Sequence, residues 1–183
     1  MTSKYYDKAV KNNKNPMYYV YEYFGIGKNC KYFVETGTHL GGSVEVALEL
    51  GFEKVFSCEF MQDRYEFCMD KFKGNDNVYL WNGSSLDTFP EIISLLDQKS
   101  LFWLDAHGEG GGVPTFEELD LIKESSIKNH NILIDDIPIY FNDVRDKLKE
   151  KILEINPKYK FVDFQTNHGT DYDVLGAYVG STK

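Results

Sequence analysis

Three acidic residues follow two short apolar segments of the sequence. Asp105 comes directly after LFWL, and Asp135 and Asp136 come directly after NILI. If these segments are neighbouring strands, the three carboxylates meet at one edge of a sheet, where they raise one another's pKa unless a cation lies among them. Carboxylate oxygens are the ligands that Mg²⁺ prefers. The sequence therefore predicts a divalent metal site at Asp105, Asp135 and Asp136, although solvated acids or a turn that begins at Asp136 would account for the same residues.

One histidine lies two residues beyond the first of these acids. The imidazole of His107 can take a proton from a substrate hydroxyl whose pKa a metal ion has lowered. Asp105 is the alternative base, and His107 would then hold an aspartate in place by a hydrogen bond. His130 precedes the NILI segment and is expected on the surface. We therefore predict His107 as the catalytic base, with Asp105 as the alternative.

A glycine-rich turn in residues 31–43, KYFVETGTHLGGS, predicts a second kind of site. Its glycines permit a positive φ or a close approach of the backbone to a ligand, and the helix expected from Ser43 supplies N–H groups at its start. About twenty residues further on, Glu59 ends another apolar segment, where an acid can bind both hydroxyls of a ribose. An exposed acid is the alternative. The glycine spacing differs from the dinucleotide pattern G-x-G-x-x-G and no phosphate-binding lysine follows, so the turn favours a different nucleoside cofactor.

Strand-like and helix-like segments alternate along the chain. The expected strands are 32–34, 54–59, 77–81, 101–104, 131–134, 160–164 and 174–179, and the expected helices are 43–50, 63–73, 89–97, 115–127 and 143–155. This order predicts an α/β fold with a doubly wound, Rossmann-like sheet that is mostly parallel, ends in an antiparallel hairpin and has helices on both faces. Ligands of such sheets bind at the carboxyl ends of the strands. The acids and the glycine turn should therefore meet at one cleft.

The chain of 183 residues is expected to form a single domain, with a catalytic core over residues 31–183. Residues 1–30 precede this core, and the Tyr- and Phe-rich part at 17–24 predicts a helix that either packs against the sheet edge or forms a lid over the cleft. Acceptor specificity is expected in this helix, in the glycine-rich loop at 108–113 and in the hairpin connection at 165–173, which contains His168.

The composition argues against several classes of partner. With a net charge of -9 and a pI near 4.9, the chain lacks the basic surface that nucleic acids and anionic membranes require. Its three cysteines form no C-x-x-C pair, as expected of reduced thiols in the cytoplasm. No apolar segment has membrane-spanning length, and no signal peptide opens the chain. We expect a soluble cytoplasmic protein with a small-molecule or glycan partner, and a homo-oligomer is compatible with this composition.

Four segments together resemble the class I S-adenosylmethionine-dependent methyltransferase family: VETGTHLGGS, FSCEF, NGSS and FWLDAH. The resemblance extends from Lys31 to the C-terminal hairpin and implies S-adenosylmethionine as the cofactor. It also implies that the methionine moiety is held by Glu35, Thr36, Gly37 and Thr38, the ribose by Glu59, and the adenine by Phe60 and Ser84, with Ser43, Gly83 and Asp105 as further cofactor contacts. Many members carry an Asp in the turn where this chain has Asn82, so the adenine contact is where the chain departs from the family.

Within that family, the acids after the LFWL and NILI segments are similar to those of macrocin-type, metal-dependent sugar O-methyltransferases. Catechol-type enzymes have an Asp-Asn pair where this chain has Asp135 and Asp136. The resemblance implies methylation of a hydroxyl of a sugar or glycan, with the acceptor oxygen in line with the sulfonium methyl. Two alternatives remain, namely a catechol-type small-molecule O-methyltransferase and a protein that binds S-adenosylmethionine or another nucleoside without catalysis.

Overall fold

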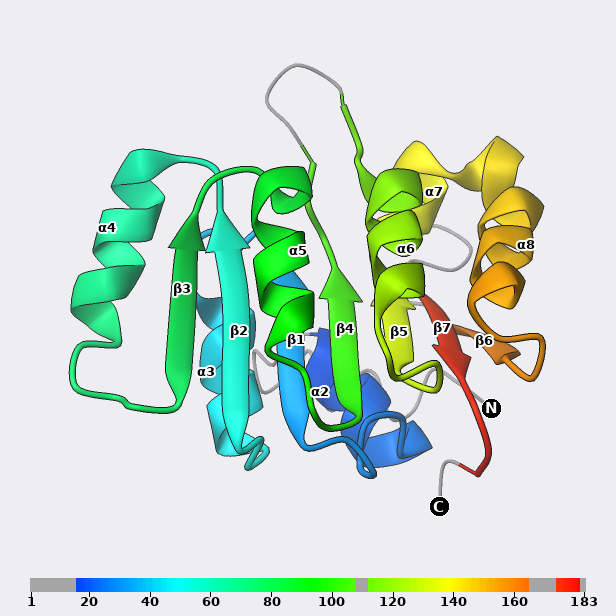
Figure 1. The fold of residues 1–183 in the computed structure, drawn as a ribbon, viewed down its shortest axis with the longest axis horizontal. Helices are drawn as coiled ribbons and strands as arrows, with labels where there is room; N and C mark the ends of the chain where they lie inside the picture. The colour runs from blue at the N-terminus through cyan, green and yellow to red at the C-terminus, as the bar shows by residue number, and fades with distance from the viewer. Residues whose placement is uncertain (1–15, 108–111, 165–173, 182–183) are drawn as a thin grey trace.

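The computed structural model of the chain describes residues 16–107, 112–164 and 174–181, which build a seven-stranded sheet between two layers of helices (Figure 1). The strands are β1 (Tyr32–Thr36), β2 (Lys54–Glu59), β3 (Val78–Asn82), β4 (Ser100–Leu104), β5 (Asn131–Ile134), β6 (Lys160–Phe164) and β7 (Val174–Tyr178). They lie in the order β3-β2-β1-β4-β5-β7-β6, with β1 to β5 parallel and β7 antiparallel between β5 and β6. The predicted mostly parallel sheet with a C-terminal antiparallel hairpin is confirmed.

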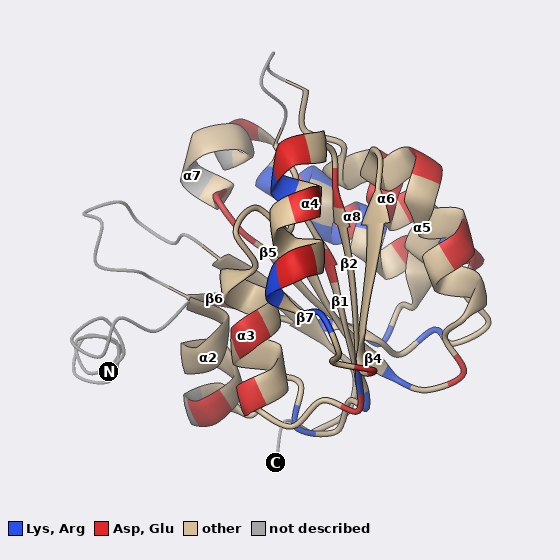
Figure 2. Ribbon diagram, turned by 90° about the vertical axis from the view of Figure 1, so that its left-hand side faces the viewer, with Lys and Arg blue, Asp and Glu red and all other residues tan. Residues whose placement is uncertain are grey.

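Helices cover both faces of the sheet, and the view along the sheet separates the two layers (Figure 2). One layer contains α5 (Ser85–Ser94), α6 (Thr115–Glu124) and α8 (Arg145–Ile155), and the other contains α2 (Pro16–Tyr19), the π-helix η1 (Val20–Phe24), α3 (Gly42–Glu49) and α4 (Gln62–Lys71). Two short helices, α7 (Ile137–Tyr140) and η2 (Asn142–Val144), follow β5. Among the helices that the structure describes, none is long and apolar enough to cross a membrane.

Alternate residues of the central strands enter two separate cores, because successive side chains of a strand point to opposite faces. On the side of α5, α6 and α8, Val34, Phe56 and Phe102 belong to one buried cluster. On the side of α3, Phe33 and Trp103 belong to another. Since both faces are covered, the central strands are apolar along most of their length, as is typical of parallel sheets.

The order of strand addition reverses between β1 and β4. Strand β1 pairs with β2 on one side, where Thr36 aligns with Cys58, and with β4 on the other side, where Thr36 aligns with Leu104. In open α/β sheets, ligands bind outside the carboxyl ends of the strands at such a switch point. The fold therefore places the glycine turn after β1 and Asp105 after β4 on the two sides of the expected ligand crevice.

Two helical features differ from the sequence prediction. Helix α5 begins at Ser85 instead of Phe89, because the Ser84 hydroxyl caps the helix by accepting a hydrogen bond from the Asp87 N–H at 3.2 Å. Helix α7 is not predicted by the apolar pattern, since it is only four residues long. Both features follow from local hydrogen bonding at turns, which the spacing of apolar residues does not report.

The described part of the N-terminal segment covers the sheet. Met17, Tyr19 and Val20 are buried in the core on the α3 side, in the same cluster as Phe33 and Leu133. Helix α2 lies behind the sheet toward the amino ends of the strands (Figure 1). The described part of the segment thus packs on a face of the sheet and not at its edge, and the role as a lid stays a prediction.

His130 is buried, so the surface position expected from the sequence is wrong. Its exposed fraction is 0%, its Nδ1 accepts the Ser100 N–H at 3.0 Å, and its Nε2 lies 2.9 Å from the Ser125 hydroxyl oxygen. The Tyr159 hydroxyl donates to the His130 carbonyl at 2.7 Å. Burial lowers the pKa of His130 to about 4, with a smaller effect in the same direction from nearby lysines. The neutral ring therefore joins the start of β4 to the end of α6.

Candidate functional site

The ends of five parallel strands bring the predicted site residues to the upper edge of the sheet in Figure 1. Thr36 aligns with Leu104, and Leu104 aligns with Ile134. On the other side, Glu59 aligns with Asn82. The turns that follow these residues are therefore neighbours, as the sequence predicts. Residues 108–111 and 165–173, which include His168 and most of the segments expected to select the acceptor, lie outside the described residues.

The turn after β1 is held against the turn after β4. Gly37 has a φ of 84°, and a Cβ at this position would lie 3.0 Å from the carbonyl oxygen of Asp105. The Asp105 N–H donates to the Thr36 hydroxyl at 3.2 Å. The N–H groups of Gly37 and Thr38 both donate to the Cys58 carbonyl, at 3.0 and 3.1 Å. Only glycine combines this φ with so close a contact, which gives a physical reason for its place in the turn.

Glu35 lies beneath this turn with an exposed fraction of 1%. Its Oε2 accepts a hydrogen bond of 2.8 Å from the Ser57 hydroxyl, whose oxygen lies 2.6 Å from the Thr38 hydroxyl oxygen. Burial raises the pKa of Glu35 to about 8, against the opposing effect of the Ser57 and Ser43 hydroxyls. The side chains predicted to hold the methionine moiety, Glu35, Thr36, Thr38 and Ser43, are all buried in the foundation of the turn, and their contact with a cofactor stays a prediction.

Glu59 is oriented by the backbone on two sides. Its Oε2 accepts the His39 N–H at 2.7 Å, and its Oε1 accepts the Met61 N–H at 2.8 Å. Each carboxylate oxygen can accept a further hydrogen bond, so Glu59 fits the two hydroxyls of a ribose. The next residue, Phe60, has an exposed fraction of 72%, which suits the predicted stacking with adenine.

The polar side chains of the turn after β3 form hydrogen bonds to other protein groups. The Ser84 hydroxyl accepts the Asp87 N–H and donates to the Asp87 carboxylate at 2.6 Å. The Asn82 amide donates to the Glu59 carbonyl at 3.1 Å. The predicted adenine contact at Gly83 and Ser84 would therefore depend on the backbone of this turn.

Asp105, His107 and Asp136 form a compact group, in which one ligand atom of each residue lies within 4.8 Å of the others. Asp136 has a φ of 54°, a left-handed conformation that is uncommon outside glycine. Asp135 is not part of the group, and its Oδ1 accepts the Asp136 N–H at 2.9 Å. The structure thus brings together two of the three predicted aspartates and adds the predicted base, while metal binding itself stays a prediction.

The surroundings of Asp105 favour its protonated form. Burial raises the pKa of Asp105 to about 6, and the charge of Asp136 acts in the same direction. The Trp103 Nε1–H, which donates to Asp105 at 3.3 Å, and His107 oppose this rise. The donor set fits a divalent cation, but an imidazole beside two carboxylates suits Mn²⁺ or Zn²⁺ at least as well as Mg²⁺, which prefers oxygen ligands alone.

Helix α7 adds aromatic and apolar surface beside this group. The exposed ring of His107 stacks on the Tyr140 ring, with a centroid distance of 5.8 Å and an interplanar angle of 24°. Ile139 has an exposed fraction of 68%. Neither residue is predicted as part of the site, because the sequence pattern predicts no helix there, although the apolar IPIY segment directly after the acidic pair is a usable signal.

Glu118 of α6 is a further acid near the site that the sequence pattern does not predict. Its side chain is fully buried beside the hydroxyls of Thr36 and Ser85. Burial raises its pKa to about 7, and the two hydroxyls act against this rise. An acid among the apolar positions of an amphipathic helix is the signal that could have revealed it.

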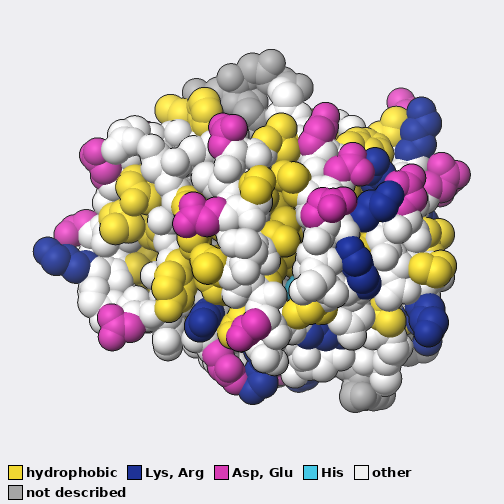
Figure 3. Space-filling view, viewed as in Figure 1, with side chains coloured by type: hydrophobic (Ala, Val, Ile, Leu, Met, Phe, Trp, Pro, Cys, Tyr) yellow, Lys and Arg dark blue, Asp and Glu magenta, His cyan; other side chains and the backbone are white. Residues whose placement is uncertain are grey.

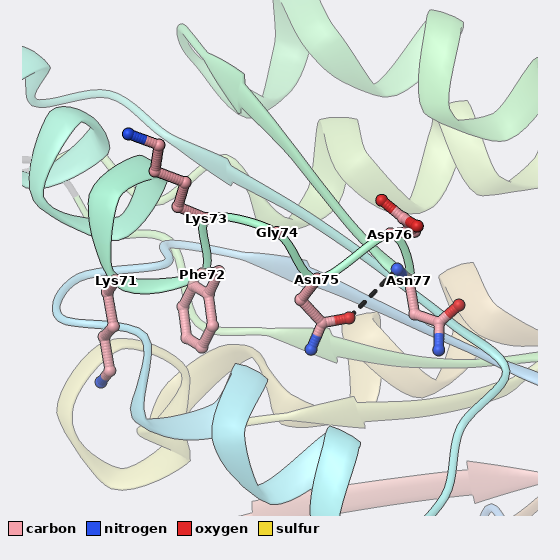
Figure 4. A pocket seen from close by; sticks show the side chains of 7 residues that line it. All are labelled: Lys71, Phe72, Lys73, Gly74, Asn75, Asp76 and Asn77. Carbon is pink, nitrogen blue, oxygen red and sulfur yellow. Dashed lines mark hydrogen bonds between the residues drawn. The ribbon is translucent and has the colours of Figure 1, made fainter.

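A separate hollow of about 480 Å³ lies at the amino end of β3, away from these turns (Figure 4). Residues 71–77, between the end of α4 and the start of β3, line it, and the Asn77 N–H donates to the Asn75 side chain at 3.1 Å. It contains none of the predicted site residues, and one turn forms all of its lining. We therefore place the candidate site at the carboxyl ends of the strands.

The outer face over α5, α6 and α8 mixes acidic and basic side chains (Figure 3). Ion pairs join Lys123 to Glu154 at 3.0 Å and Lys151 to Asp120 at 2.6 Å. This face therefore lacks, among the residues described, the extended basic surface that nucleic-acid binding requires. The absence of a nucleic-acid partner stays a prediction.

Comparison with known proteins gives similarity at the level of the fold. No protein-family model matches the sequence, and no curated protein matches it significantly. The chain is similar to the O-methyltransferase from Bacillus cereus solved in complex with SAH, with a TM-score of 0.67 and 17% identity over 98% of this chain and 92% of that chain. It is also similar to the O-methyltransferase TomG from Streptomyces achromogenes, involved in tomaymycin synthesis and solved in complex with SAM, with a TM-score of 0.62 and 13% identity over 98% and 92% of the two chains. The chain has the class I S-adenosylmethionine-dependent methyltransferase fold.

Spermidine synthase from Thermotoga maritima shares this fold, with a TM-score of 0.62 and 13% identity over 86% of this chain and 57% of that chain. One fold therefore serves different transfer reactions, and the reaction must be argued from the site. Neither similar O-methyltransferase is described as macrocin-type, so these comparisons do not support the finer resemblance to sugar-modifying enzymes.

Proposed function

We propose that this protein is an S-adenosylmethionine-dependent O-methyltransferase that acts on a hydroxyl of a sugar or glycan with the help of a divalent metal ion. The observation that carries the proposal is the position of two half-sites at one edge of the sheet. The glycine turn and Glu59 lie on one side of the switch point, and the group of Asp105, His107 and Asp136 lies on the other. Methyl transfer needs a cofactor and an acceptor held next to each other in this way.

The cofactor half is built to hold a nucleoside. S-Adenosylmethionine supplies an electrophilic methyl group when it is bound. Glu59 would accept hydrogen bonds from the ribose, and Phe60 would cover the adenine. The contact of Gly37 with the Asp105 backbone keeps this half at a constant distance from the acceptor half. The protein thus contributes positioning, which accounts for a large part of the barrier reduction in transfers of this kind.

The acceptor half is built to bind and deprotonate a hydroxyl. A divalent ion held by Asp105 and Asp136, with or without His107, would lower the pKa of a hydroxyl bound to it. If His107 is not a metal ligand, its exposed ring is placed to take the proton. Adjacent hydroxyls of a sugar offer two oxygens to one ion, and Tyr140 offers an aromatic face to the carbon–hydrogen side of the ring. The same features would accept a catechol, which remains the alternative acceptor.

Calorimetry with S-adenosylmethionine, with and without Mg²⁺ or Mn²⁺, is the first test. We expect cofactor binding in either case and metal-dependent transfer to members of a sugar panel, detected by mass spectrometry. No binding at millimolar cofactor would overturn the proposal. Transfer at the same rate in the presence of a chelator would overturn only the part of the proposal that concerns the metal ion. Transfer to catechols but to no sugar would favour the catechol-type alternative, and binding without transfer to either panel would favour a non-catalytic nucleoside-binding protein.

A further inference from the structure

Glu118 is a buried acid that lacks a well-formed hydrogen bond within the described residues. Its exposed fraction is 0%, and no donor meets either carboxylate oxygen in good geometry, although the hydroxyls of Ser85 and Thr36 lie close enough to lower its pKa. It lies on the buried side of α6 together with Thr115, Leu119 and Ile122. An ionised carboxylate in such a position is unfavourable unless a donor or a cation compensates it.

Glu118 faces the underside of the candidate cofactor site. The hydroxyls of Thr36 and Ser85 lie beside its carboxylate. Thr36 ends β1 and accepts the Asp105 N–H, and Ser85 begins α5 directly after the turn that follows β3. Glu118 therefore lies below the place where the turns after β1, β3 and β4 approach one another.

Within the described residues, the ionisable groups that interact with Glu118 bring no positive charge to it. Glu118 interacts electrostatically with three ionisable groups: Glu117 of its own helix, Asp105 after β4 and the Cys58 thiol of β2. None of these groups can carry a positive charge. Glu35, the buried acid on the other face of the sheet, differs because the Ser57 hydroxyl donates to it.

We propose that Glu118 is a positioning residue of the cofactor site and that its carboxylate favours a cationic ligand, the sulfonium S-adenosylmethionine, over the neutral thioether S-adenosylhomocysteine. The inference rests on the proposed function. A buried charge acts through a medium of low dielectric constant, so it stabilises a nearby cation without touching it. The hydroxyls of Thr36 and Ser85 can turn their hydrogens toward the carboxylate and so orient the end of β1 and the start of α5. A lower affinity for the product than for the substrate would speed the exchange of the cofactor after each transfer.

Paired calorimetric titrations with S-adenosylmethionine and S-adenosylhomocysteine at about pH 8, above the pKa of about 7 of Glu118, test the proposal. Glu118→Gln should weaken binding of the cation on the order of 10-fold and change binding of the thioether by less than about threefold. Glu124→Gln, which removes an exposed acid from the last turn of the same helix, should change neither affinity. Glu118→Asp keeps the charge and should keep a preference for the cation.

Thermal unfolding of the ligand-free variants separates this role from a structural one. Glu118→Gln should unfold at the same or a higher temperature than the wild type, because it removes a buried charge that lacks compensation. Equal weakening of both ligands, or an unchanged preference for the cation, would overturn the proposal while the proposed function stands. If the wild type binds neither ligand, the proposed function fails and this inference fails with it.

Discussion

The acids near the candidate site differ in their surroundings more than in their chemistry. All three glutamates are buried, but backbone N–H groups donate to both oxygens of Glu59, whereas side-chain hydroxyls lie beside Glu35 and Glu118 on opposite faces of the sheet. Asp105 is partly buried and lies in a group with an imidazole. These surroundings suit the same functional group to three tasks: hydrogen bonding to a ligand, electrostatic support, and metal binding or proton transfer.

The two half-sites predict different effects of removing their acids. Asp136→Ala should abolish methyl transfer but leave the affinity for S-adenosylmethionine within a few-fold of the wild type, because Asp136 belongs to the acceptor half. Glu59→Ala should weaken cofactor binding by roughly 10- to 100-fold, since it removes hydrogen bonds from a carboxylate to the ribose. Calorimetry and rates at saturating cofactor measure the two effects. A similar loss of cofactor affinity in both variants would contradict the division into halves.

His107 can be tested as the base because its side chain is exposed. His107→Ala should lower the transfer rate by on the order of 10² to 10⁴ while the unfolding temperature stays unchanged. Tyr140→Phe, which keeps the ring that stacks on His107, is the matched control and should retain the rate. A wild-type rate in His107→Ala would reassign the role of the base to Asp105.

At the scale of elements, the site depends on contacts between turns that belong to different strands. The turn after β1 touches the turn after β4 through Gly37 and through the hydrogen bond from Asp105 to Thr36. Helix α7 brings Tyr140 next to His107. The cofactor half and the acceptor half are thus joined by the sheet and not by consecutive residues.

Gly37→Ala tests this junction, and Gly74→Ala is a control with nearly the same backbone. The two glycines have φ values of 84° and 83°, but a Cβ would meet the Asp105 carbonyl at 3.0 Å at Gly37 and would meet nothing within 4 Å at Gly74. Both variants should lose roughly 1 to 2 kcal/mol from the left-handed backbone, and Gly37→Ala should lose more because of the contact. Only Gly37→Ala should also weaken cofactor binding. Equal cofactor affinity in the two variants, measured calorimetrically, would show that the junction does not shape the site.

At the scale of the whole molecule, the buried acids predict the pH dependence of stability. Burial raises the pKa of Glu35 to about 8 and that of Glu118 to about 7, from an ordinary value of 4.5 that applies to the unfolded chain. The folded state therefore binds protons more strongly, and the resulting stabilisation is complete below pH 4.5 and is lost as the pH rises through 7 and 8.

We accordingly expect the free energy of unfolding of the ligand-free protein to fall between about pH 5 and about pH 9. Urea denaturation at a series of pH values measures this fall. Glu35→Gln and Glu118→Gln should each reduce its slope, whereas Glu124→Gln, at the exposed end of α6, should not. A profile that is the same in all four proteins would rule out these two acids as its cause.

Much of the fold was predictable because strand and helix signals are local. Apolar runs such as LFWL and NILI predict buried parallel strands, and the alternation with amphipathic segments predicts the doubly wound order that the structure confirms. The departures have two kinds of cause. The start of α5 moves because of a local cap at Ser84. His130 is buried in a tertiary contact, with hydrogen bonds to Ser100, 30 residues earlier in the chain, and to Ser125 at the end of α6.

The sequence by itself determined which residues follow each strand, and so it predicted the glycine turn, Glu59, Asp105 and the acidic pair at one edge of the sheet. It could not distinguish Asp135 from Asp136, because that choice depends on the left-handed backbone at Asp136.

Only the tertiary structure decided how these residues are grouped. It placed His107 and Asp136 with Asp105, put Tyr140 beside them, and enclosed Glu118 beneath the turns. The reason is physical: the type of a residue and its position on a strand follow from local sequence, whereas burial, charge and partners arise where segments far apart in the chain pack against one another.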